Sequence, residues 1–223
     1  IVVAQQLINV IDAEAPVVPV LSDVIAECTV TVSTPTAQDN CAGTITATTT
    51  DAVSFSSEGV YVINWSFDDG NGNVVIVPQN VIIDDTTAPI EPVLETVTSQ
   101  CAITVTAPTT LDACAGTITG TTTDALTYTA EGVYNIHWIF NDGNGNQSEA
   151  DQTVVVDDNE APVVPTLETV TGECSATATV PTTTDNCSGI ITGTTTDSLV
   201  YSTAGTYTIT WTFDDGHNNV VTA

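Results

Sequence analysis

The sequence predicts an all-β fold, built from tandem β-sandwich repeats in an extended array. Three observations predict it. Val, Ile and Thr are abundant, and these residues favour strands. Short apolar–polar alternations are separated by clusters of Gly, Pro, Asn and Asp, which is typical of strands joined by turns. The whole pattern then recurs along the chain at a fixed spacing, the signature of a repeat architecture.

The pattern recurs at a constant step along the chain, because 101 − 28 = 73 and 138 − 65 = 73. The residues that recur at this step are two cysteines and a tryptophan: Cys28, Cys101 and Cys174; Cys41, Cys114 and Cys187; Trp65, Trp138 and Trp211. Residues 1–14 align with residues 74–87. We therefore expect the end of an earlier repeat at 1–14, repeats at 15–87 and 88–160, and a shortened repeat at 161–223. We also expect the array to continue beyond both ends.

One stretch of each repeat alternates strictly between apolar and polar residues. Tyr207, Ile209, Trp211 and Phe213 alternate with threonines, which places one strand face in a core and the other in water. A Gly-x-Tyr triplet enters this strand and predicts a tyrosine corner, in which the hydroxyl bonds back to the backbone. These features indicate an immunoglobulin-like sandwich. The strand would be F, residues 68–73 of the first repeat the F–G turn, and 74–83 strand G.

The charge balance limits the possible partners. The 223 residues include 28 Asp and Glu but no Lys or Arg, giving a formal net charge of −28. Nucleic acids and anionic membrane surfaces are excluded as partners, because binding to them depends on Lys and Arg. No apolar run is long enough for a membrane-spanning helix. Divalent cations, calcium above all, are the natural counter-charge for so many carboxylates.

Six cysteines without Cys-x-x-Cys spacing indicate an oxidising, extracellular compartment. A regular array favours one pairing used three times, with each repeat closing its own bridge: Cys28–Cys41, Cys101–Cys114 and Cys174–Cys187. The distance between Cys28 and Cys41 along an extended strand is too long for a disulfide. About five strand residues would separate the first pair by roughly 16 Å, whereas a disulfide needs Cα atoms within about 7 Å. Residues 35–40 would have to fold back, and buried free thiols are the alternative.

The order of these motifs resembles the hyalin repeat, an immunoglobulin-like extracellular module. The resemblance rests on Cys28-x-Val-x-Val, Asp39-Asn40-Cys41, Gly59-x-Tyr61 and Trp65-x-Phe67-Asp68-Asp69-Gly70, and it covers nearly the whole chain. The second repeat departs with Asp112-Ala113-Cys114, and the third with His217-Asn218-Asn219 in its turn. The acidic, Thr-rich, Lys-free form is similar to repeat arrays of Bacteroidota surface proteins, notably SprB-type gliding adhesins. That similarity implies type 9 secretion, a surface filament and attachment to substrata during gliding.

Acidic turns and linkers are the candidate metal sites. Alternate oxygen-bearing residues in the F–G turn are arranged as in calcium loops, although the motif alone favours a Gly/Asn-rich hairpin turn. In an immunoglobulin-like domain the incoming linker, the B–C loop and the F–G loop meet at one pole. Carboxylates that converge there without Arg or Lys repel unless a cation bridges them, so we expect calcium to stiffen the junctions. The predicted ligands are Asp12, Asp39, Asp69, Asn71 and Asn73; Asp84, Asp85, Asp112, Asp142, Asn144 and Asn146; Asp157, Asp158, Asp185 and Asp215.

Two short triplets, at 85–87 and 197–199, resemble the O-glycosylation signal of Bacteroidota and mark Thr86 and Ser198. His137 and His217 do not recur between repeats, so neither is expected to be a ligand or a catalytic base. No Ser/His/Asp or paired-carboxylate arrangement stands out within a repeat. The sequence therefore does not predict an enzyme.

These observations favour a structural stalk or adhesin segment of a large secreted cell-surface filament, which mediates surface attachment in gliding motility. Its expected partners are neighbouring repeats of the same chain and extracellular substrata or glycans. Tandem copies would let weak contacts sum to strong attachment. A module that binds glycans or proteins through its loops is one alternative, although the tryptophans lie on the expected core face. An accessory stalk of a secreted enzyme is the other.

Overall fold

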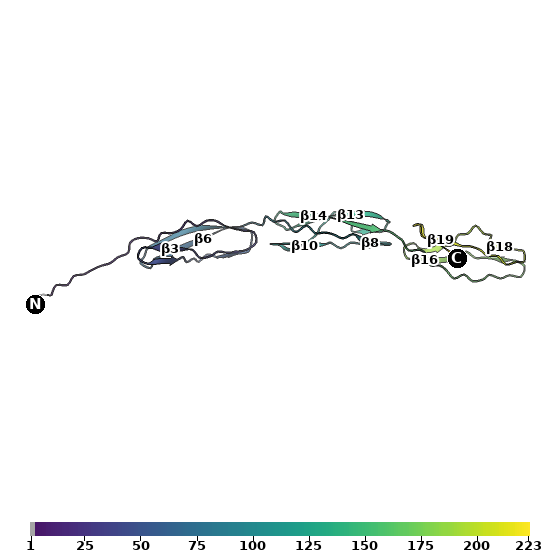
Figure 1. Cartoon of the computed structure of the whole chain (residues 1–223), viewed down its shortest axis with the longest axis horizontal. Helices are drawn as coiled ribbons and strands as arrows, with labels where there is room; N and C mark the ends of the chain where they lie inside the picture. Colours follow the sequence, from purple (N-terminus) through teal and green to yellow (C-terminus); the bar gives the residue numbers. More distant parts are fainter. Residues whose placement is uncertain (1–2) are drawn as a thin grey trace. The chain divides into compact units, whose positions relative to one another are not determined.

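The computed structural model describes residues 3–223, and strands, bridges and turns make up all of their regular structure (Figure 1). The predicted all-β fold is confirmed. The chain divides into two compact units. Unit 1 runs to Ile90 and adds Thr110–Ile118 and Asn141–Ser148, whereas unit 2 comprises Glu91–Thr109, Thr119–Phe140 and Glu149–Ala223. Each unit contains one linker between two sequence repeats. Residues 1–2 of the expected 1–14 segment lie outside the described residues, and the repeat boundaries stay predictions.

The strands of the first repeat are short except for one long hairpin. They are β1 (Val24–Ala26), β2 (Val30–Thr31), β3 (Thr36–Asp39), β4 (Gly43–Thr46), β5 (Ser54–Phe55), β6 (Gly59–Asp68) and β7 (Val74–Ile83). β6 and β7 pair antiparallel from Gly59↔Ile83 to Asp68↔Val74. β1 adds in parallel on the outer side of β7, while β2 pairs with β5 and β3 with β4. The hairpin matches the expected strands F and G and the turn between them.

The remaining strands lie at places that correspond to those of the first repeat, although none of residues 161–175 forms a strand and β19 covers only the end of the long strand. They are β8 (Val97–Ser99), β9 (Ile103–Thr104), β10 (Thr109–Asp112), β11 (Gly116–Thr119), β12 (Thr127–Tyr128), β13 (Gly132–Asn141), β14 (Gln147–Val156), β15 (Ala176–Thr177), β16 (Thr182–Asp185), β17 (Gly189–Thr192), β18 (Val200–Tyr201), β19 (Thr212–Asp214) and β20 (Val220–Thr222). None of the described residues forms a helix long and apolar enough to cross a membrane.

Alternate side chains of the long hairpin build the core, as the period-two pattern predicts. Ile63, Trp65 and Phe67 of β6 are at most 1% exposed, and Val81 of β7 is fully buried against them. Each buried aliphatic or Phe side chain contributes roughly 1.5–3 kcal/mol. The indole Nε1 of Trp65 donates to Gln79 Oε1 at 2.9 Å, so the ring is buried without losing its hydrogen bond.

The predicted tyrosine corner is present in all three repeats. The hydroxyl of Tyr61 donates to the carbonyl of Ser57 at 2.9 Å, and those of Tyr134 and Tyr207 donate to carbonyls four residues upstream at 2.8 and 3.1 Å. The Tyr61 ring stacks on Phe55 with centroids 4.5 Å apart. The corner therefore anchors the start of the most hydrophobic strand to the preceding turn.

Candidate functional site

The disulfides connect one sequence repeat to the next, and the predicted pairing within each repeat is wrong. Cys28 is bonded to Cys114, and Cys101 to Cys187, each across 86 residues with Cα atoms 4.9 Å apart. Cys41 is free and exposed, as is Cys174. Neither of these two is buried, so the alternative of buried thiols fails as well.

The two cysteines of one repeat lie at opposite ends of it, which is why they do not pair. Cys28 follows β1, whose end lies beside the outgoing linker, because Asp84 N donates to Ala26 O at 3.1 Å. Cys41 lies in the β3–β4 turn beside the incoming linker, where Asn40 Nδ2 donates to Glu14 Oε2 at 2.6 Å. Residues 36–39 form β3 and do not fold back along the chain. The cysteine beside the outgoing linker of one repeat, such as Cys28, therefore bonds to the cysteine in the β3–β4-type turn of the next repeat, such as Cys114.

An aspartate two residues before each turn cysteine shapes that turn. Asp112 Oδ1 accepts hydrogen bonds from the amides of Cys114 and Ala115 at 2.7 and 2.8 Å. Asp39 and Asp185 accept the same pair of bonds in their own turns. All three residues are at most 9% exposed, and the second oxygen, Oδ2, is buried with no hydrogen-bond partner. A buried carboxylate oxygen without a donor is costly, so a positive ligand would stabilise it.

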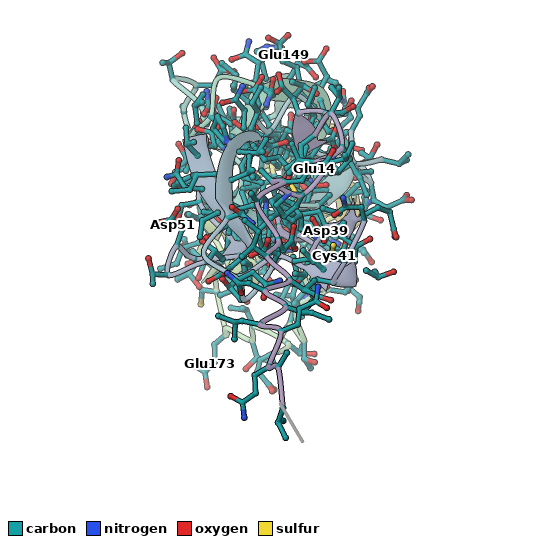
Figure 2. The ribbon with its side chains drawn as sticks, turned by 90° about the vertical axis from the view of Figure 1, so that its left-hand side faces the viewer. Glu14, Asp39, Cys41, Asp51, Glu149 and Glu173 are labelled. Carbon is teal, nitrogen blue, oxygen red and sulfur yellow. A yellow bond between two sulfur atoms is a disulfide. The ribbon has the colours of Figure 1, made fainter. Side chains whose placement is uncertain are left out.

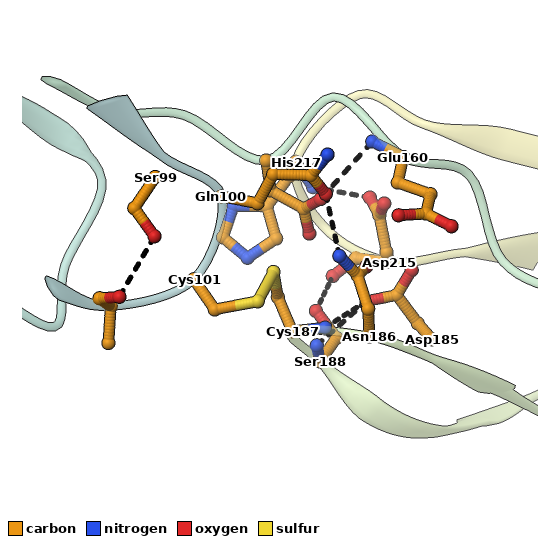
Figure 3. The surroundings of a disulfide bond; sticks show 12 residues. Ser99, Gln100, Cys101, Glu160, Asp185, Asn186, Cys187, Ser188, Asp215 and His217 are labelled. Atoms are coloured by element: carbon orange, nitrogen blue, oxygen red, sulfur yellow. Dashed lines mark hydrogen bonds between the residues drawn. A yellow bond between two sulfur atoms is a disulfide. The ribbon is translucent and has the colours of Figure 1, made fainter. Parts of the chain in front are cut away.

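A second carboxylate enters each site from the linker. Asp85 and Asp158 are 4% exposed, and Asp158 Oδ2 is also buried without a partner. Ligand atoms lie within 4.8 Å of one another in three groups, which are Asp12, Asp39 and Cys41; Asp85, Asp112 and Cys114; and Asp158, Asp185 and Cys187. We call these groups the linker clusters. Asp39 and Cys41 of the first group lie side by side in Figure 2, and Figure 3 shows Asp185 and Cys187 of the third group at the Cys101–Cys187 disulfide.

The turns that follow β6, β13 and β19 each carry a further carboxylate, which is not a member of the linker clusters. Asp142 Oδ1 accepts from the amides of Asn144 and Asn146 at 2.7 and 3.1 Å. Burial alone would raise the pKa of Asp142, but hydrogen bonds from Asn146 and the Asn144 amide hold this pKa below its ordinary value. Asp69 and Asp215 are held in the same way, each with a lowered pKa. Asp215 Oδ2 is buried without a partner. These carboxylates stay ionised at neutral pH.

The turn asparagines tie the linker to the hairpin. In the second repeat Asn144 Nδ2 donates to Asp85 Oδ2 at 3.1 Å, and Asn146 Nδ2 donates to Asp85 O at 2.8 Å. In the first repeat Asn71 and Asn73 make the equivalent bonds to Asp12 at 3.0 and 3.4 Å. The side-chain NH2 groups of these asparagines therefore donate to the linker. That their side-chain oxygens bind a metal stays a prediction.

Not every predicted residue joins a cluster. Asp84 and Asp157 are exposed, while their neighbours Asp85 and Asp158 point inward. Thr86 and Ser198 are exposed, and their hydroxyls bond to Glu27 Oε1 and to Val200 O. Glycosylation of these two residues stays a prediction.

The structure also shows linker contacts that the sequence did not predict. Glu131 Oε1 accepts from Asp158 N at 3.1 Å and from His217 Nδ1 at 2.9 Å. The hydrogen bond between His217 and Glu131 raises the pKa of His217 and lowers the pKa of Glu131. Glu58 holds the amide of Asp85 in the same way, at 3.3 Å. Both glutamates directly precede the Gly-x-Tyr triplet, a recurrence that could have identified them.

The donor set of the linker clusters fits a hard divalent cation. Carboxylate and carbonyl oxygens are the ligands that calcium takes, and the chain has no Lys or Arg to neutralise them. An open cavity beside the Cys28–Cys114 disulfide is lined by four acidic residues: Glu27, Glu58, Asp85 and Asp142. The sulfurs of Cys114 and Cys187 are in disulfides, so they do not supply the thiolates that soft metals prefer. Partial desolvation of the sulfur and the nearby carboxylates of Asp12 and Asp39 raise the pKa of the free, exposed Cys41 thiol.

Comparison with known protein families and with curated protein sequences gives no match for this chain.

Proposed function

We propose that this chain is a structural segment of a secreted cell-surface protein, in which a disulfide and a calcium ion together fix each linker between repeats. The observation that carries the proposal is the set of buried, unpartnered Oδ2 atoms of Asp112, Asp158 and Asp185 beside the two disulfides. Among the described residues, the buried carboxylate oxygens without a hydrogen-bond partner lie at the linkers and in the turns beside them.

The disulfides support a structural role because they join successive repeats. Cross-linking residues 86 apart stabilises a folded chain by about 4–5 kcal/mol in the loop-entropy view. A bridge within a repeat would protect that repeat only. A bridge across the linker also resists separation of the two repeats, which suits a chain that transmits tension. Disulfides persist in oxidising surroundings, which supports the extracellular location.

Calcium supports the same role by neutralising the linker clusters. Each cluster brings at least two carboxylates within 4.8 Å, and part of each is buried. Like charges at this distance disfavour the folded linker, whereas a bound dication reverses the sign of the interaction. Asp85 and Asp112 would hold the ion at the first linker, and Asp158 and Asp185 at the second. Asp142 and Asp215 would add oxygens from the hairpin turns.

Surface attachment is the biological role that this architecture suits best. The resemblance to hyalin repeats and to SprB-type gliding adhesins supports type 9 secretion and contact with substrata or glycans during gliding. A glycan-binding module would need exposed aromatic rings on which sugars can stack. The tryptophans do not provide them, because Trp65 and Trp138 are each 1% exposed and Trp211 is 5% exposed. An accessory stalk of a secreted enzyme is consistent with the same structural proposal.

Thermal unfolding of the oxidised chain with calcium or with a chelator tests the proposal. Binding to the folded state alone stabilises by RT ln(1 + [L]/Kd), about 2.7 kcal/mol at a hundredfold excess over Kd. We expect Tm to rise with calcium, and the rise to shrink in Asp85→Asn. Asp84→Asn is the matched control, since it removes the neighbouring exposed carboxylate. A Tm that does not respond to calcium, or an equal loss in both variants, would contradict the proposal.

A further inference from the structure

One edge of the long strand β6 is covered along only part of its length. β6 is the last strand of its sheet, whose order is β1-β7-β6. On the side away from β7, Ser66 exchanges two main-chain hydrogen bonds with Thr48, each at 2.8 Å. After Thr48 the chain turns away, and Asp51 N donates to Thr49 Oγ1 at 3.0 Å within the turn. The first half of β6 therefore has no strand on this side among the described residues.

The hydrogen-bond pattern shows which main-chain groups face this uncovered side. Alternate residues of an antiparallel strand turn their N–H and C=O groups to opposite sides, and Ser66 turns its own away from β7. By this alternation Val60, Val62 and Asn64 turn theirs away from β7 as well. Asp51 Oδ2 accepts from Asn64 N at 2.7 Å. The main-chain groups of Val60 and Val62 have no partner among the described residues, and we call them the open edge.

The side chains beside the open edge are apolar and exposed. Val60 is 73% and Val62 is 48% exposed. Val60 pairs with Ile82 of β7, and Ile82 pairs in turn with Ile25 of β1, which is 73% exposed. A row of three aliphatic side chains thus crosses the outer face of the sheet and ends at the open edge. An extended segment added to β6 would cover the two valines and pair with their main chain at the same time.

The later repeats keep the capping aspartate but not both valines. In the second repeat Asp124 Oδ2 accepts from His137 N at 2.8 Å, as Asp51 does from the amide of its own strand. The counterpart of Val62, however, is Asn135 in the second repeat and Thr208 in the third. The cap is therefore a general feature of these repeats, whereas the apolar open edge is specific to the first.

The opposite edge of the same sheet does not offer a continuous ladder. Residues 74–80 of β7 extend beyond β1, which pairs with residues 81–83 only. Pro78 lies within that stretch, at one of the positions that turn away from β6, and proline has no N–H to donate. Strand addition is therefore favoured at β6 and not at β7.

We infer that the open edge of β6 binds an extended, positively charged segment of another protein by strand addition. In this general recognition mode, main-chain hydrogen bonds give affinity and alternate side chains give specificity. Apolar side chains opposite Val60 and Val62 would bury the two valines. Asp51 is exposed at the end of the open edge (Figure 2), and its Oδ1 has no partner among the described residues. A lysine or arginine opposite Asn64 would pair with this carboxylate.

Charge decides which kind of segment the open edge takes. The chain has a formal net charge of −28 and no Lys or Arg, so a second copy would bring a field of the same sign and be repelled. A segment that carries Lys or Arg is attracted instead. The inference goes beyond the proposed function and does not rest on it, because main-chain pairing requires no calcium. An experiment in chelator therefore separates the two proposals.

Fluorescence anisotropy of a labelled synthetic peptide, Lys-Thr-Val-Thr-Val-Lys, with the oxidised chain in chelator tests the inference. We expect saturable binding with a Kd below about 1 mM. Val62→Asn should weaken it roughly fivefold, because one apolar cross-strand pair is lost. Val74→Asn is the matched control: it makes the same change at a residue that is 50% exposed on β7, and it should bind like the parent chain. Both variants should fold, because the second repeat has Asn135 and Gln147 at these places.

Absence of saturable binding at millimolar peptide would overturn the inference. Equal binding of a peptide with aspartates in place of its lysines, or equal weakening by Val62→Asn and Val74→Asn, would overturn it as well. Hydrogen exchange gives the location: the amides of Val60 and Val62 should exchange more slowly with peptide, and unchanged exchange there would contradict the open edge as the site. Sedimentation that shows concentration-dependent dimers without peptide, lost in Val62→Asn, would assign the edge to a second copy instead.

Discussion

Cys28 is covalently bonded to Cys114, 86 residues away, and not to Cys41 of its own repeat. The second disulfide, Cys101–Cys187, repeats this connection one step later. The two disulfide loops overlap, because residues 101–114 belong to both. A covalent path from Cys28 to Cys187 therefore passes through this short segment alone. Each of these two linkers is consequently spanned by one disulfide.

Removal of one disulfide should weaken the fold strongly. We expect Cys28→Ser/Cys114→Ser to lower the free energy of unfolding in urea by about 4 kcal/mol, because the unfolded chain regains the entropy of a large loop. Cys41→Ser/Cys174→Ser is the control and should change it by less than about 0.5 kcal/mol. Equal effects in the two double variants would show that the disulfides pair differently in solution.

Asp112→Asn should have opposite effects with and without calcium. In chelator we expect the variant to be more stable than the parent chain, because the substitution removes a buried charge close to Asp85. The Asn oxygen can still accept the two turn amides. In saturating calcium the variant should be less stable, because a ligand is lost. Tm measured in both conditions checks this reversal, and a shift of the same sign in both would count against a cation at the linker.

Protonation of His137 should be stabilised by two carboxylates. The hydrogen bond from its Nδ1 to Asp151, at 2.8 Å, raises the pKa of His137 above 6.5, and Glu149 lies 3.4 Å from Nε2. Because the folded pKa is the higher one, the stabilisation is full below the unfolded pKa and is lost as pH rises through the folded value. The groups are exposed, so the effect on stability is small.

NMR titration of the imidazole resonances measures this directly. We expect Asp151→Asn to lower the pKa of His137 and to leave that of His217 unchanged. An unaltered His137 pKa in the variant would show that the contact does not persist in solution.

The tyrosine corner should contribute measurably to stability. Tyr134→Phe removes the hydroxyl that donates to Ala130 O at 2.8 Å but keeps the ring that stacks on Tyr128. We expect a loss of about 1 kcal/mol in unfolding free energy. Tyr128→Phe is the matched control, since Phe55 holds the corresponding place in the first repeat, and it should be nearly neutral. A larger loss in the control would assign the effect to ring packing.

Side-chain periodicity predicted the fold well. The alternation from Tyr61 to Phe67 predicted the long strand, because burial on one face forces a period of two. The Gly-x-Tyr triplet predicted the corner hydrogen bonds. The linker geometry also followed from topology in part, since Asp85 does meet Asp112. Alternate residues of a linker face opposite ways, so Asp84 points into solvent.

The disulfide pairing could not be read from the repeat. A shift of the sequence by one repeat turns the pair Cys28–Cys41 into Cys101–Cys114, and it turns Cys28–Cys114 into Cys101–Cys187 just as well. The expectation that residues 35–40 fold back assumed that each cysteine pairs with the next one along the sequence. The separation expected between Cys28 and Cys41 along an extended strand pointed against that assumption. His217 was missed because it replaces an asparagine: its counterpart Asn144 contacts Asp85 of the preceding linker.

Extension of the single oxidised chain by its termini, in calcium and then in chelator, tests the central claim most directly. Between Cys28 and Cys187 only residues 101–114 can extend, so we expect a contour length of about 45 Å there, against about 550 Å after reduction. Unfolding forces should be higher in calcium than in chelator. Equal forces in the two conditions, or release of the fully reduced contour length before reduction, would contradict linkers fixed jointly by a disulfide and a cation.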